Sequence, residues 1–239
     1  MYHLNTLTTS THRTALDIEQ EVIANPVRHY TIEASSFDLP VTHIKALLQK
    51  NCGICIKSTD PFPKTTLAAF INIGKERVSL LAKGFEEADL LAHLEKGASM
   101  LVSKNDGFDL MQIEKLINQG KERCSLIGSE LSEEQLSKFL DKGASLLLKK
   151  EDLTPFAISR LVVLGQGRVN IQSAGFSNFR IDKFLADKAT ITIGEGNKLP
   201  RFKVEQKVKE YKQQIQVSSA HISKKQWLNK LEGLGAVIV

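Results

Sequence analysis

The sequence predicts an α/β fold in which about ten short parallel strands alternate with short helices and stack as a solenoid with an open, curved sheet. Three observations predict it: a motif that recurs about every 46 residues, a second strand-like segment half-way through each period, and a helical pattern between successive strands. The 239 residues are 42% hydrophobic and 25% charged, which excludes a disordered chain, a collagen-like chain and a small disulfide scaffold.

The recurring motif starts at five positions, which are His29, Arg77, Arg123, Arg168 and Gln214. Successive starts lie 48, 46, 45 and 46 residues apart. Apolar residues alternate with polar ones at the start of each copy, and this period of two predicts a strand.

A second set of strand-like segments lies between these motifs, at 53–57, 99–103, 145–149, 190–194 and 236–239. The stretches 86–96 and 133–142 between strands carry leucines at three- and four-residue spacing, which predicts one buried helical face. One strand and one short helix cannot enclose a core alone, so the units must stack. A closed barrel of eight strand–helix units is the competing architecture, but its units average about 30 residues. The shorter and more numerous units here favour the open solenoid.

The expected organisation is an N-terminal helical cap or extension over 1–28 and a β/α repeat solenoid over 29–239. A basic helical insert is expected at about 197–213. Residues 198–230 contain nine Lys and Arg against two acidic residues, so this segment has a net charge of +7. The whole chain has a net charge of +5, so the other residues together carry −2. The basic patch Lys203, Lys207, Lys209 and Lys212 could meet an acidic partner, although a solvated helix face is the more common role of such a patch.

The strand motif resembles that of leucine-rich repeats, in which apolar-x-apolar is followed by a polar turn and another apolar residue. Val78, Leu80 and Phe85 show it, and the copies that start at Arg123, Arg168 and Gln214 repeat it. The asparagine of that family is mostly missing after the strands. Short side chains with acceptor oxygens follow the second set of strands instead and are expected to be structural turn caps, and these are Asp60, Asp106, Asp152 and Asn197.

The resemblance implies a non-enzymatic protein–protein interaction scaffold or adaptor, similar to bacterial secretion-system accessory or effector proteins. The candidate partner-binding residues share one strip of the predicted sheet and are His29, Arg77, Arg123, Arg168, Asn170, Gln214 and Gln216. Such a strip suits a protein partner with an acidic surface. The alternative is that the arginines pair with neighbouring acids at the rim. Nucleic acid is not expected as a partner, because aromatic residues suitable for base stacking are absent from the basic stretch.

No catalytic residue, metal site or cofactor is expected. Cys52-Gly-Ile-Cys55 has the spacing of a zinc or redox pair, but no second ligand pair accompanies it. Gly194-Glu-Gly196 lacks the third glycine of a dinucleotide fingerprint. Two alternatives stay open, which are a cryptic enzyme or ligand-binding protein with a site at the strand C-terminal ends, and a basic-surface binder of nucleic acid or acidic membrane.

No apolar run approaches the roughly 20 residues that a membrane helix needs, and no signal peptide is visible. An odd number of cysteines, three, favours reduced thiols. The expected location is the bacterial cytoplasm, or export without a cleaved signal peptide.

Overall fold

The computed structural model describes residues 6–7, 31–33, 39–50, 52–218 and 225–238, which fall into two compact units. The first unit contains the described residues up to Ser125, and the second runs from Leu126 to Ile238. Both alternate strands with helices, and every strand pairing that is described is parallel. The α/β class with short parallel strands is therefore confirmed.

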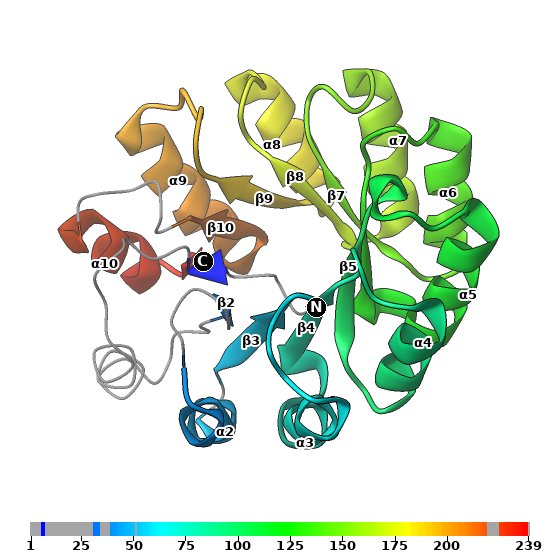
Figure 1. The fold of residues 1–239 in the computed structure, drawn as a ribbon. Helices are drawn as coiled ribbons and strands as arrows, with labels where there is room; N and C mark the ends of the chain where they lie inside the picture. Colours follow the sequence, from blue (N-terminus) through cyan, green and yellow to red (C-terminus); the bar gives the residue numbers. More distant parts are fainter. Residues whose placement is uncertain (1–5, 8–30, 34–38, 51, 219–224, 239) are drawn as a thin grey trace. The chain divides into compact units, whose positions relative to one another are not determined.

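In the first unit the strands lie side by side in sequence order, with the helices on one face of them (Figure 1). The strands are β1 (Thr6–Leu7), β2 (Thr31–Glu33), β3 (Gly53–Ile56), β4 (Val78–Leu81) and β5 (Ser99–Val102). The helices are α2 (Val41–Gln49), α3 (Lys64–Gly74), α4 (Glu87–Glu95) and α5 (Leu110–Gly120), with single 3-10 turns η2 (Lys75–Arg77), η3 (Lys104–Asp106) and η4 (Lys121–Arg123).

The second unit repeats this order, and β6 (Cys124–Ile127) spans the boundary between the units. Its strands are β7 (Ser145–Leu148), β8 (Val169–Gln172), β9 (Thr190–Ile193), β10 (Ile215–Val217) and β11 (Val237–Ile238). Its helices are α6 (Glu133–Asp141), α7 (Pro155–Gly165), α8 (Asn178–Ala186), α9 (Arg201–Tyr211) and α10 (Lys225–Gly233), with the 3-10 turn η5 (Lys212–Gln214) after α9. The helices α6 to α9 again lie on one face of the strands (Figure 1).

Two helix lengths alternate along the chain. Helices α3, α5, α7 and α9 have 11 residues each, whereas α2, α4, α6, α8 and α10 have nine. Helix α9 therefore occupies a regular place in the repeat, although the sequence led us to expect a basic insert there. The strand β1 lies within 1–28, where a helical cap was expected, and the rest of that segment lies outside the described residues.

Short polar residues start most helices of the second unit. The side chains of Ser132 and Thr154 accept hydrogen bonds from the backbone N–H groups of Gln135 and Ala157, at 3.2 and 3.3 Å. Ser177 does the same for Arg180 at 3.4 Å. These bonds satisfy donors that the first helical turn leaves unpaired. These bonds fix the residue at which each helix begins. The N-termini of these helices therefore lie along one edge of the sheet.

The core of each unit lies between its helices and its strands. In β8, Val169 and Ile171 point to the helices and are fully buried. On the opposite sheet face Ser99, Thr190 and Gln216 are 8%, 5% and 2% exposed, whereas Asn170 and Thr192 of that face are half-buried. None of the helices in the described ranges has the length and apolarity to cross a bilayer.

Candidate polar site on the sheet face opposite the helices

Three side chains meet on the face of the second unit's sheet that points away from the helices. They are Asn170 on β8, Thr192 on β9 and Gln216 on β10, on three adjacent strands. Alternation within each strand places them there, because their neighbours Ile171, Ile191 and Ile215 are fully buried on the helix side. Thr192 and Gln216 are direct partners in the register of β9 and β10.

Hydrogen bonds join the three side chains into one network. The Asn170 Nδ2 group donates to Gln216 Oε1 at 3.0 Å, although β9 lies between their strands. The Thr192 hydroxyl lies 2.9 Å from Asn170 Oδ1 and 3.0 Å from Gln216 Oε1, so it can donate to either oxygen. The network holds the Gln216 side chain in one orientation on the sheet.

The other end of the Gln216 amide has no partner. Its Nε2 atom is buried and makes no hydrogen bond, and the residue is 2% exposed. Exchanging O and N in both amides would keep the network and leave the oxygen unpaired instead, so one polar end is unsatisfied in either orientation. An unpaired buried polar group costs about 1–3 kcal/mol. The Gln216 amide is therefore a group of this face whose hydrogen-bonding capacity is not fully used.

The strands that carry the network present no charge. Strands β8, β9 and β10 read Val-Asn-Ile-Gln, Thr-Ile-Thr-Ile and Ile-Gln-Val. A buried charged ligand would therefore meet no counter-charge on these strands, and burying an unpaired charge is costly. The chemistry of the site suits an uncharged polar molecule.

Further polar groups follow the C-terminal ends of these strands. Ser173, after β8, is 2% exposed, and its hydroxyl lies 3.4 Å from Asn197 Oδ1 in the loop after β9. The backbone N–H of Ser173 donates to the carbonyl of Thr192 at 2.9 Å. This edge is where the alternative interpretation of the sequence placed a site.

The side chains of the residues that precede alternate strands point to the backbone of earlier helices and not to solvent. Arg168 Nη1 donates to the carbonyls of Leu140 and Ala144, both at 2.8 Å. Gln214 Nε2 donates to the carbonyls of Leu185 and Ala189, at 3.0 and 3.1 Å. Arg77 donates to the carbonyl of Leu48, and Arg123 donates to those of Leu94 and Ala98. Each side chain thus caps the end of an earlier helix, and binding of a partner by these groups stays a prediction.

Of the remaining partner-binding candidates, the structure brings Asn170 and Gln216 together in the network. His29 lies outside the described residues. Thr192 was absent from the sequence-based candidates, although the alternation in Thr190-Ile-Thr192-Ile places it on the same face. What the sequence does not show is that side chains on β8 and β10 reach each other across β9.

The turn residues bond to backbone N–H groups three residues earlier. The carboxylates of Asp60, Asp106 and Asp152 accept from Lys57, Ser103 and Lys149 at 2.8, 2.7 and 2.7 Å. Asn197 Oδ1 instead accepts from the backbone N–H of Leu199 at 3.4 Å. These contacts hold the turns that follow β3, β5, β7 and β9.

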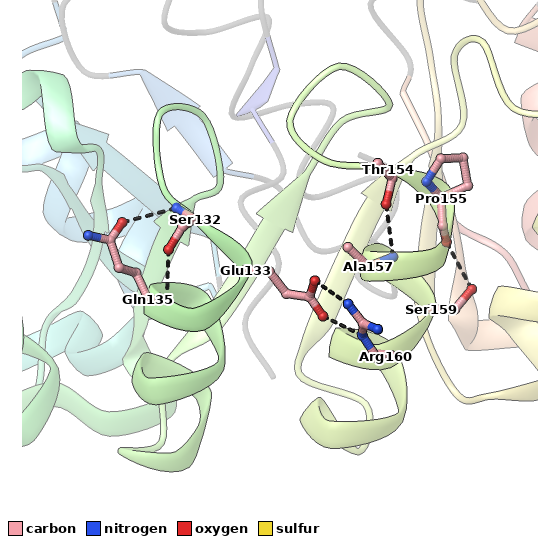
Figure 2. Close-up of polar contacts among 8 residues, drawn as sticks. All are labelled: Ser132, Glu133, Gln135, Thr154, Pro155, Ala157, Ser159 and Arg160. Atoms are coloured by element: carbon pink, nitrogen blue, oxygen red, sulfur yellow. Dashed lines mark hydrogen bonds and ion pairs between the residues drawn. The ribbon is translucent and has the colours of Figure 1, made fainter.

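Ion pairs tie neighbouring helices together on the outer face. Figure 2 shows Arg160 of α7 binding the Glu133 carboxylate of α6 through two N–H groups, both at 2.5 Å. These bonds hold the pKa of the Glu133 carboxyl below its usual value. In the same view, Ser132 and Gln135 cap α6 reciprocally, and the Ser159 hydroxyl donates to the carbonyl of Pro155. These contacts give the polar side chains drawn in Figure 2 a structural role, because each one stabilises a helix or joins two helices.

The basic patch is not one continuous surface. Lys207 is 3% exposed and forms an ion pair with Asp182 of α8. Lys209 and Lys212 are exposed, and Lys203 is half-buried. The buried lysine therefore joins α9 to α8 and does not face solvent.

The cysteines are buried and free. Cys52, Cys55 and Cys124 are 1%, 2% and 0% exposed. Burial raises the pKa of the Cys52 and Cys124 thiols to about 12, which removes their reactivity at neutral pH. Within the described ranges, no group of three or more His, Cys, Asp or Glu is arranged to hold a metal ion.

No protein-family model and no curated protein sequence matches the chain. Solved structures of tryptophan synthase from Mycobacterium tuberculosis are similar to it. An open form with a bound compound has 18% identity and a TM-score of 0.41, and the match covers 93% of this chain and 96% of that one. A structure in space group F222 has 17% identity and a TM-score of 0.41, with 94% and 96% covered.

These structures of an enzyme contradict the leucine-rich-repeat resemblance. They also contradict the expectation of a non-enzymatic scaffold, adaptor or secretion effector that was drawn from it. No activity, substrate or partner of this chain follows from a likeness at these TM-scores. The function therefore has to be argued from the site itself.

Proposed function

We propose that the second unit binds a small, uncharged polar molecule on the sheet face opposite the helices. Gln216 is the residue that contacts the ligand, and Asn170 and Thr192 position its amide. The observation that supports the proposal is the buried, unpaired Nε2 atom of Gln216, whose other end is held by two neighbours.

The ligand class follows from the groups that face it. Only one end of the Gln216 amide is free, so the ligand needs a neutral group that can pair with that end, such as the amide of a carboxamide or the edge of a nucleobase. Because β8, β9 and β10 carry no charged residue, a neutral ligand is favoured over its charged analogue. The proposal concerns binding, and no reaction is assigned.

An acidic protein partner and a cytoplasmic location stay predictions of the sequence. The three free cysteines support a reducing compartment.

The proposal is tested with a matched pair of probes of the same shape, propionamide and propionate, followed by adenosine and glucose. Binding is measured by ligand-observed NMR with the full chain. We expect the neutral amide to bind with a millimolar Kd and propionate to bind at least tenfold more weakly. Equal binding of propionamide and propionate would contradict the proposal. The absence of binding by propionamide, adenosine and glucose would contradict it as well.

Two variants locate the site. Gln216→Met keeps the length of the side chain and removes both polar ends, and we expect it to weaken binding at least tenfold. Gln213→Met makes the same change at an exposed residue and should bind like the unaltered protein. If both variants lose binding equally, or if neither does, the ligand does not contact Gln216.

A further inference from the structure

Three phenylalanines of the second unit are exposed at equivalent places. Phe156, Phe179 and Phe202 are 64%, 73% and 65% exposed, and each is the second residue of its helix. They recur every 23 residues, in α7, α8 and α9. Together they expose roughly 400 Å² of apolar surface, which is the size of a functional patch on a protein surface.

The helices that carry this aromatic row are neighbours. Helices α7 and α8 pack together, and the ion pair between Lys207 and Asp182 joins α9 to α8. Packed helices lie about 8–10 Å apart, so the three rings form a line with about that spacing. Because each ring belongs to the first turn of its helix, the line runs along the N-terminal ends of α7, α8 and α9.

Positive charge gathers at the α8 and α9 end of the row. Arg180, Lys198 and Arg201 lie in or next to the first turns of these helices, and the ion pairs of the described residues do not include them. The Arg201 guanidinium lies 5.1 Å from the centre of the Trp227 ring. The nearby Glu205 is engaged by Lys230 at 2.6 Å, whereas Glu195 and, before α7, Glu151 are exposed acids of this edge. Helix N-termini add partial positive charge.

We propose that the aromatic row binds an acidic amphipathic helix of a protein partner, laid across the N-terminal ends of α7, α8 and α9. Seven residues of an α-helix rise about 10.5 Å, so apolar side chains at i, i+7 and i+14 match the spacing of the three rings. Acidic residues beside them would meet Arg180, Lys198 and Arg201. The single line of rings fits a rod-like partner better than the broad plane of a membrane.

The probe is a fluorescent acidic peptide of about 21 residues whose leucines recur every seven residues. A second peptide has the same composition but scrambled leucine positions. We expect fluorescence anisotropy to give a micromolar Kd for the first peptide and binding at least tenfold weaker for the second. Substituting all three rings, F156S with F179S and F202S, should weaken the first peptide at least tenfold.

Two further variants make the result specific. Val163→Ser changes a side chain of α7 that is 62% exposed but lies away from the row, and it should leave the affinity unchanged. Reversing two charges, Arg180→Glu with Lys198→Glu, should weaken binding and abolish its salt dependence. Equal affinity for both peptides would overturn the proposal, as would unchanged binding by the triple variant. The proposal would also be overturned if the unaltered protein binds phosphatidylglycerol vesicles but not the first peptide, and the triple variant loses the vesicle binding.

Discussion

The two units carry different chemistry on the same face of the sheet. In the first unit, Cys55, Ser79 and Ser99 are partners in register across β3, β4 and β5, and all are buried. In the second unit, Asn170, Thr192 and Gln216 occupy three adjacent strands of that face. The short side chains of the first unit cannot reach across a strand, whereas the two amides can. The repeat therefore supplies a common scaffold. The network of three hydrogen-bonded side chains belongs to the second unit, although Ser79 Oγ of the first unit is also buried without a partner.

The helix caps differ between copies in a similar way. Arg168 binds two carbonyls with a charged group, and Gln214 makes the equivalent pair of bonds with a neutral amide. Hydrogen bonds from charged donors contribute more to stability than those from neutral ones. The last copy of the repeat should therefore be less firmly held than the copy before it.

The largest expected effect is the loss of an arginine cap. Arg168→Ala removes two charge-assisted hydrogen bonds, to the carbonyl of Leu140 at the end of α6 and to that of Ala144 before β7, and should lower the free energy of unfolding by about 3 kcal/mol. Gln214→Ala should cost about half of that. Urea unfolding of the second unit can be followed by the fluorescence of Trp227, because the sequence has one tryptophan.

The loss of an arginine cap in the first unit can be measured separately, through the reactivity of the cysteines. All three cysteines precede the boundary at Ser125, so their reaction with a thiol reagent reports on that unit. Arg123→Ala should raise thiol reactivity far more than it shifts the Trp227 signal. Arg160→Ala is the control, because its exposed ion pair is worth at most about 1 kcal/mol. Equal losses for Arg160→Ala and Arg168→Ala would contradict the role of the caps.

The next effect concerns the junction between helix and strand. A Cβ added to Gly165 would lie 2.6 Å from Val169 Cγ2, so Gly165→Ala should cost about 1–3 kcal/mol through overpacking. A Cβ at Gly233 meets nothing within 4 Å, and Gly233→Ala should be neutral or stabilising by about 0.5 kcal/mol. Thermal unfolding of both variants measures the difference. A loss of stability in both would show that backbone conformation, and not packing, governs these positions.

The smallest effect is a pH dependence that arises in the first unit. Burial lowers the pKa of His93 below its ordinary value of 6.5, with Asp89 opposing the shift and Lys96 and Lys64 adding to it. Since the unfolded chain binds the proton more readily, the stabilisation is complete above about pH 6.5 and is lost as the pH falls towards the lowered pKa. His93→Gln should flatten the dependence of the unfolding midpoint between about pH 7 and pH 5. An unchanged slope would assign the pH dependence to other groups.

Sequence periodicity predicted the strands and helices well, because alternation and helical spacing are local signals. Cys124, Val169 and Ile215 begin strands at the expected places. Two features escaped prediction for physical reasons. Whether the arginines face solvent or an earlier helix depends on contacts made across more than 20 residues of sequence. Likewise, the burial of Ser99, Thr190 and Gln216 on the face opposite the helices is a tertiary property that a pattern along one strand does not contain.

The site was predicted in part. Asn170 and Gln216 were recognised as outward-facing strand residues, but their mutual hydrogen bond depends on the side chains spanning β9. The aromatic row was visible in the sequence as Phe156, Phe179 and Phe202 at a spacing of 23 residues. The spacing alone does not show that the rings face solvent, because the exposure of a helix residue depends on tertiary packing.

The most direct test of the ligand site is the side-chain amide resonance of Gln216 in a ¹H–¹⁵N NMR spectrum. The signal is identified by its absence from the Gln216→Met variant. We predict that propionamide shifts this resonance in a saturable manner while the Gln213 amide stays in place. A Gln216 resonance that does not move at saturating ligand, or that moves no more than that of Gln213, would contradict the account.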